Sequence, residues 1–224
     1  MRIMRNRRTG RWRILAAVIL LFVDLAGMEG CARLPITTKV VREDARVVVK
    51  LQQEVDRTTY SHPVTLGQQD IAAILKGFSL REDRGPLLRW YQEDIPPIPV
   101  FRDDEIEALV PALVEALQGA KVNERVAFEV RAPGNDPREE REVTAGWLAI
   151  RDPYFHLTVE FHHAQLPTRK SMTYERYYPT PPPAPKSFSL YFEPGRFWVL
   201  DKTFGERVVD FRGFLQSAPV PRKN

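Results

Sequence analysis

The chain is poor in the residues and motifs on which common enzymes depend. It has one cysteine, Cys31, in 224 residues, so it cannot form an internal disulfide. The zinc-protease motif H-E-x-x-H, the phosphate-binding glycine loop and the dinucleotide-binding glycine pattern are absent. The glycine pattern of a nucleophile elbow around Ser79 fails at Arg81, and no serine precedes a lysine by three residues. These absences count against the classes of enzyme that depend on these motifs.

Long apolar runs are also missing, except near the N-terminus. The run from Ile14 to Ala26 contains one polar residue, Asp24, and is shorter than the ~20 residues of a membrane-spanning helix. The residues before it include six arginines: Arg2, Arg5, Arg7, Arg8, Arg11 and Arg13. A cationic start, a short apolar stretch and small residues after it are typical of an export signal.

The positive charge of the chain resides in this N-terminal segment. The whole sequence has 33 basic and 29 acidic residues, a formal net charge of +4. Without residues 1–30, 27 basic and 27 acidic side chains remain. Nucleic-acid binding depends mainly on neutralising phosphates, so we expect no nucleic-acid partner.

The segment Leu25–Cys31 ends in a small residue followed by cysteine, and it resembles the lipobox of bacterial lipoprotein signal peptides. The resemblance implies a diacylglyceryl group on the sulfur of Cys31, cleavage between Gly30 and Cys31, and acylation of the new amine. Two or more acyl chains would anchor the protein stably in a bilayer. Ala32, rather than aspartate, follows the cysteine, which in such lipoproteins implies the outer membrane and its periplasmic face.

Two other fates of this segment stay open. Ordinary signal cleavage could follow Ala32, because Gly30, Cys31 and Ala32 also form a small-x-small site. The segment could instead stay uncut as a signal anchor, which would make the protein a subunit of an inner-membrane complex.

The residues after the signal are enough for one domain. Residues 31–44 are polar and contain a proline, and we interpret them as a tether. Residues 45–215 are predicted to form a single periplasmic domain, and residues 216–224 a disordered tail.

The apolar pattern predicts an α+β fold. Apolar residues recur at helical spacing over 65–77, with Thr65 as the expected cap, and over 103–118, where Asp103 is the expected cap and Pro111 interrupts the pattern. From Glu124 onward apolar and polar residues alternate, as in half-buried strands. We therefore expect two amphipathic helices, followed by and packed on an antiparallel meander sheet of about five strands. The domain resembles uncharacterised envelope lipoproteins in general layout only.

The candidates for chemistry lie on one predicted strand. His156, Glu160 and His162 alternate with apolar residues, which predicts that they share one face, with His163 on the other. Glu160 and His162 could share a zinc ion with help from another strand. We favour an ordinary solvated face and expect no metal, no other cofactor and no catalytic residue. A metal-binding or hydrolytic envelope enzyme using these three residues is the alternative.

A proline-rich connection carries the candidate contact residues. Five prolines lie within 179–185, beside Tyr174, Tyr177 and Tyr178, and such a segment favours extended polyproline structure. Aromatic rings of this kind can stack on a glycan or a protein segment. The sequence as a whole therefore predicts a non-enzymatic, lipid-anchored envelope protein with a binding or assembly role and an envelope protein or glycan as partner.

The lipoprotein interpretation predicts the chemical form of the N-terminus. Mass spectrometry of the membrane-extracted protein should show a peptide that begins at an acylated Cys31, and Cys31→Ser should leave the precursor uncut. Residues 1–30 still attached to the wild-type protein would refute the interpretation.

Overall fold

In the computed structural model, two antiparallel sheets and three helices make up the part of the chain that the structure describes, residues 35–55, 58–82, 96–138, 140–167, 188–202 and 205–217. The larger sheet has seven strands in the order β1-β2-β5-β6-β7-β10-β9. Their bounds are β1 Ile36–Glu43, β2 Val47–Gln53, β5 Glu124–Pro133, β6 Glu140–Arg151, β7 Tyr154–Pro167, β10 Glu206–Asp210 and β9 Trp198–Asp201.

A three-stranded sheet lies beside the helices and joins segments that are far apart in the sequence. It consists of β4 Ile98–Pro99, β3 Phe78–Glu82 and β8 Phe188–Phe192, in that order. The helices are α2 Gln68–Lys76, α3 Asp103–Gly119 and α5 Phe211–Ser217, and a short 3-10 helix covers Gly195–Phe197.

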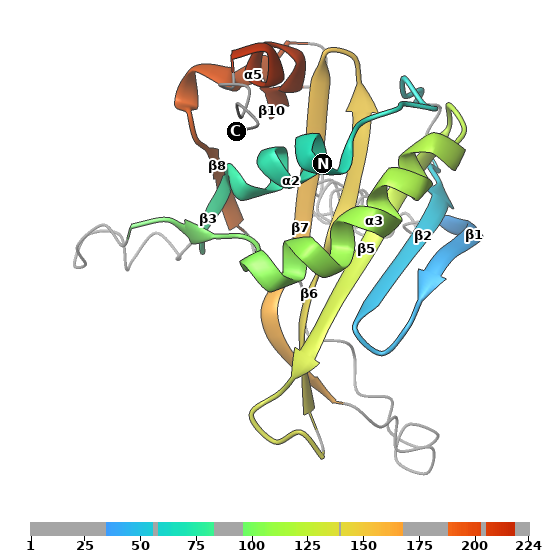
Figure 1. Cartoon of the computed structure of the whole chain (residues 1–224), viewed down its shortest axis with the longest axis vertical. Coiled ribbons are helices and arrows are strands. Elements are labelled where there is room, and N and C mark those ends of the chain that lie inside the picture. Colours follow the sequence, from blue (N-terminus) through green and yellow to red (C-terminus); the bar gives the residue numbers. More distant parts are fainter. Residues whose placement is uncertain are drawn as a thin grey trace, which may run out of the picture. The chain divides into compact units, whose positions relative to one another are not determined.

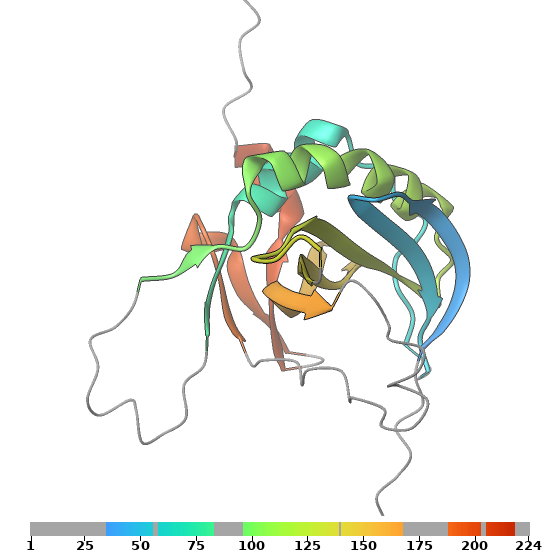
Figure 2. The same ribbon diagram turned by 90° about the horizontal axis from the view of Figure 1, so that it is seen from below.

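Helices α2 and α3 cover the same face of the large sheet (Figures 1 and 2). Their buried stripes include Ile71 and Ile74 on α2 and Leu109 and Leu113 on α3, all fully buried. The facing strands supply valines and aromatic rings, so one core lies between helices and sheet. Its central strand residues are Val47, Val49, Leu51, Val126, Phe128, Val130, Leu148, Ile150 and Phe155.

The predicted α+β fold, two helices followed by about five strands, is wrong. The described chain is mostly β, with ten strands in two sheets. Strands β1 and β2 precede both helices, and β3 and β4 pair with each other between them. Short strands such as β4, with two residues, have too few positions to show an alternating pattern.

The predicted ends of the domain also need correction. Residues 36–43, interpreted as part of a tether, form β1, the edge strand of the large sheet. Almost all its side chains are exposed, so its sequence has no buried face to reveal it. Residues 216 and 217, predicted to belong to a disordered tail, are the last two residues of α5, and the rest of the predicted tail lies outside the described residues.

Both helices begin at residues other than the predicted caps. Gly67, and not Thr65, is the N-cap of α2, and its N–H donates to Asp70 Oδ2 over 3.1 Å. Arg102, and not Asp103, is the N-cap of α3. Pro111 lies inside α3 on its exposed side and does not divide the helix.

His62 ties the segment before α2 to two strands of the large sheet. The ring is 3% exposed. Its Nδ1 lies 2.8 Å from the carbonyl oxygen of Glu124, and its Nε2 lies 3.0 Å from the backbone N–H of Ile150. An N–H can donate only to a ring nitrogen without a proton, so Nε2 accepts and Nδ1–H donates. The fold therefore requires a neutral His62.

This requirement predicts a loss of stability in acid. Burial lowers the pKa of His62 below 6.5 and lowers that of His156 and of His162 to about 4. As the pH falls, these histidines become protonated in the unfolded chain before they do so in the folded protein. Their contribution to the free energy of unfolding is therefore complete above pH 6.5 and decreases as the pH drops below it. Urea titrations between pH 7 and pH 5 should show this decline.

The variant His62→Gln should be about 2 kcal/mol less stable at pH 7, since two buried hydrogen bonds change partner. Its stability should decline less steeply toward pH 5 than that of the wild type. A wild-type stability that stays constant over this range would contradict the assignment.

Candidate functional site

The structure does not gather the three histidine and glutamate residues that the sequence singled out. His156, Glu160 and His162 all lie on β7, where six positions span roughly 20 Å. Glu160 is exposed. His162 Nε2 lies 3.3 Å from the carbonyl oxygen of Pro99. The three side chains therefore have no common partner among the contacts of the described residues.

His156 is buried at a separate place, beside the buried Asp201 and the exposed Glu206. It is 3% exposed, its Nε2 is 3.9 Å from Asp201 Oδ2, and its Nδ1 is 3.7 Å from Glu206 Oε2. Burial, and next the positive charge of Arg151, lower the pKa of His156 to about 4, against the opposing effect of Asp201. The ring is therefore neutral near pH 7, and these distances are too long for hydrogen bonds.

An irregularity in β7 creates a different site. The pairing of β7 with β6 shifts register on both sides of Ala145, which lies opposite Phe161. His163 has a φ of 46°, an uncommon left-handed conformation for a residue other than glycine. His162 and His163 consequently line the same cavity, of about 570 Å³, beside the start of α3. The expectation that these two rings lie on opposite faces is wrong because of this bulge.

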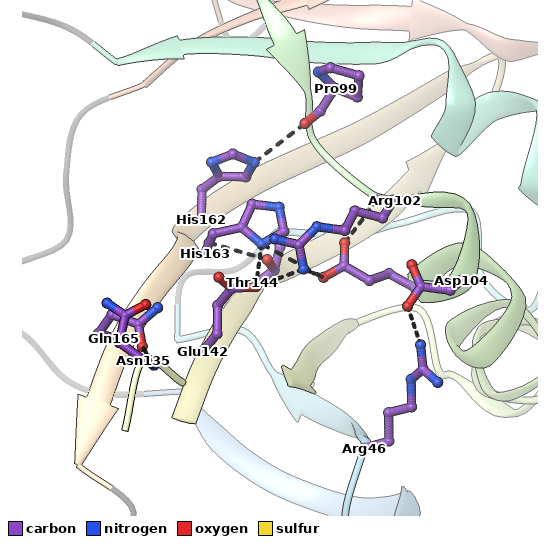
Figure 3. A network of polar contacts seen from close by, with 11 residues as sticks. Arg46, Pro99, Arg102, Asp104, Asn135, Glu142, Thr144, His162, His163 and Gln165 are labelled. Atoms are coloured by element: carbon purple, nitrogen blue, oxygen red, sulfur yellow. Dashed lines mark hydrogen bonds and ion pairs between the residues drawn. The ribbon is translucent and has the colours of Figure 1, made fainter. Parts of the chain in front are cut away.

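Four charged or titratable side chains meet at the first turn of α3, and we call them the α3 cluster: Arg102, Glu105, Glu142 and His163. Glu142 Oε1 accepts from Arg102 Nη1 over 2.7 Å and lies 3.0 Å from His163 Nδ1 (Figure 3). Glu105 Oε2 accepts from the backbone N–H of Arg102 over 2.8 Å and so caps the helix. Glu105 Oε1 lies 3.8 Å from His163 Nδ1 and 3.9 Å from Arg102 Nη1.

The electrostatics of the cluster favour a charged Glu142 carboxylate. Burial would raise the pKa of Glu142, but hydrogen bonds from Arg102 and His163 outweigh it and hold this pKa below its usual value. The hydrogen bond between Arg102 and Glu142 also raises the pKa of Arg102. Burial, followed by the charge of His163, lowers the pKa of the neighbouring His162. The α3 cluster thus combines two carboxylates, one guanidinium and one imidazole from three elements.

A groove of about 550 Å³ adjoins the cluster and is lined by four arginines, and we call it the arginine groove. Its arginines are Arg46, Arg102, Arg131 and Arg141. Arg46 pairs with Asp104 at 2.5 Å and Arg131 with Glu129 at 2.6 Å. Arg141 lies 3.7 Å from the same Glu129, and its buried Nε has no hydrogen-bond partner in the described part of the chain.

Within the residues described, Glu105, Glu142 and His163 are the one group of three whose potential metal-ligand atoms lie within 4.8 Å of one another. Glu105 could be anticipated in part, because acidic residues are favoured in the first turn of a helix. Glu142 and His163 were missed, since their meeting depends on the strand register and on the bulge.

Comparison with models of known protein families found no match, and neither did searches of curated proteins and of solved structures. None of the helices in the described ranges is long and apolar enough to cross a membrane. Cys31, Tyr174, Tyr177 and Tyr178 lie outside the described residues, so the predictions for lipid attachment and for aromatic contacts stay predictions.

The capping role of Glu105 predicts a local loss of stability. Glu105→Ala should lower the free energy of unfolding by about 2 kcal/mol, because it removes a helix cap and an ion-pair partner of Arg102. Glu107→Ala, an exposed position on the same helix, should change it by less than about 0.5 kcal/mol. Equal effects in urea unfolding would contradict the role assigned to Glu105.

Proposed function

We propose that the protein is a lipid-anchored envelope lipoprotein with a non-enzymatic binding role, and that its domain binds an anionic group of an envelope partner in the arginine groove. The anchor is inferred from the sequence around Cys31 and would hold the protein at the periplasmic face of the outer membrane. The binding surface is inferred from the groove.

The observation that carries the binding role is the imperfect pairing of the groove arginines. Arg131 and Arg141 share one carboxylate, Glu129, and the Arg141 contact of 3.7 Å is beyond hydrogen-bond distance. Buried guanidinium donors without a partner are costly. The side chain of Arg141 is 35% exposed, so a carboxylate or phosphate in the groove would pair with its terminal N–H groups, since the planar guanidinium group suits both.

The alternative of an enzyme using His156, Glu160 and His162 has no support from their positions. His156 is buried beside Asp201, and Glu160 is exposed. His162 lies beside the carbonyl oxygen of Pro99. A binding role requires only the groove and its charges.

A labelled oligoglutamate peptide is a suitable probe of the groove. Fluorescence anisotropy at low salt should show binding, which rising salt weakens. Arg141→Gln and Arg46→Gln should each lower the affinity about fivefold, the effect of roughly 1 kcal/mol. Arg196→Gln is the control, because this exposed arginine lies outside the groove.

Equal losses in the groove variants and in the control would show that the peptide binds by overall charge alone. That result, or no binding at low salt, would contradict the proposed site.

A further inference from the structure

We propose that the α3 cluster is a binding site for a divalent transition-metal ion of the zinc class, with Glu105, Glu142 and His163 as ligands. Arg102 is the cation that neutralises these carboxylates in the metal-free form. This inference goes beyond the proposed function and does not depend on what the arginine groove binds.

The spacing of the three ligand atoms fits such an ion. His163 Nδ1 lies 3.0 Å from Glu142 Oε1 and 3.8 Å from Glu105 Oε1. Tetrahedral zinc with bonds of about 2.0 Å to nitrogen and oxygen holds its ligand atoms about 3.3 Å apart. The observed distances lie on both sides of this value, so small side-chain movements would complete the ligand set.

The oxygen that faces this space is poorly satisfied. The side chain of Glu105 is 4% exposed, and its Oε2 is occupied as the cap of α3. In the part of the chain that the structure describes, its Oε1 lies 3.8 Å from His163 Nδ1 and 3.9 Å from Arg102 Nη1, both beyond hydrogen-bond distance. A carboxylate oxygen whose cationic partners lie beyond hydrogen-bond distance gains from a cation that comes within bonding distance.

The charges favour the exchange of Arg102 for a divalent ion. Two carboxylates and one guanidinium leave the cluster with one net negative charge when His163 is neutral. A divalent ion in place of the guanidinium would bring the net charge of the cluster to zero. The side chain of Arg102 is 50% exposed and also lines the arginine groove, so it can leave Glu142 without being buried elsewhere.

The backbone fixes the ligands from three separate elements. Glu105 lies in the first turn of α3, Glu142 on β6, and His163 at the bulge of β7, where its N–H donates to Thr144 Oγ1 over 3.3 Å. Thr144 is 1% exposed, so its packed side chain restrains the backbone of His163. An unusual backbone conformation held by its surroundings is a feature of ligand sites.

Solvent can reach the cluster through the cavity that His162, His163 and Arg102 line. Zinc would bind Nδ1 of His163, so the ring would carry its proton on Nε2 instead.

The test is a zinc titration of the purified, chelator-treated protein by calorimetry, with the metal content checked after gel filtration. The wild type should bind one zinc per chain. Glu142→Gln and His163→Gln should each weaken binding at least about tenfold, and Arg102→Gln should strengthen it about tenfold, because the competing cation is gone. Glu160→Gln, on the same strand as His163, is the matched control and should bind as the wild type does.

An increase in affinity on Arg102→Gln cannot arise from misfolding, so this variant keeps the test decisive even if a ligand variant folds poorly. A wild type without stoichiometric zinc would overturn the proposal. So would zinc binding that Glu142→Gln leaves unchanged, or an Arg102→Gln affinity equal to or below that of the wild type.

Discussion

The carboxylate of Glu105 is the charged group around which this end of the molecule is built. It is 3% exposed, and a charge so deeply buried must have partners. One oxygen caps α3 through the N–H of Arg102, and the other faces the guanidinium and His163. The start of α3, the bulge of β7 and the first residues of β6 are thereby tied together by charge. Arg102 belongs both to this cluster and to the arginine groove, so the two ionic features of the structure share one side chain.

Parts of the fold could be predicted because the buried face of a helix or strand requires apolar residues at regular spacing in the sequence. The stripe from Ile106 to Leu117 indicated α3, and the alternation from Val126 onward indicated the strands β5, β6 and β7. Strand β1 has almost no buried side chain, so no such pattern marks it. The small sheet pairs β3 with β8 across more than a hundred residues, and local periodicity contains no information about so distant a partner.

The site was less accessible to sequence reasoning than the fold. Strict alternation along residues 155–162 predicted that His156, Glu160 and His162 lie on one face, because a bulge leaves no clear trace in composition. In the structure the register shifts beside Ala145 and the left-handed His163 bring that histidine to Glu142 instead. His162 and His156 are separated by the length of the strand itself, since six positions span roughly 20 Å. Two register shifts, one on each side of Ala145, thus decide which side chains meet, in keeping with the period of two in a strand.

The most direct test of the account is the position of a zinc ion, measured by anomalous diffraction at the zinc edge from crystals grown with the metal. The account predicts one peak about 2.0–2.2 Å from Glu105 Oε1, Glu142 Oε1 and His163 Nδ1. Arg102 should be turned away from Glu142 toward the groove. A structure in which Arg102 still binds Glu142, with no zinc at these three atoms, would contradict it.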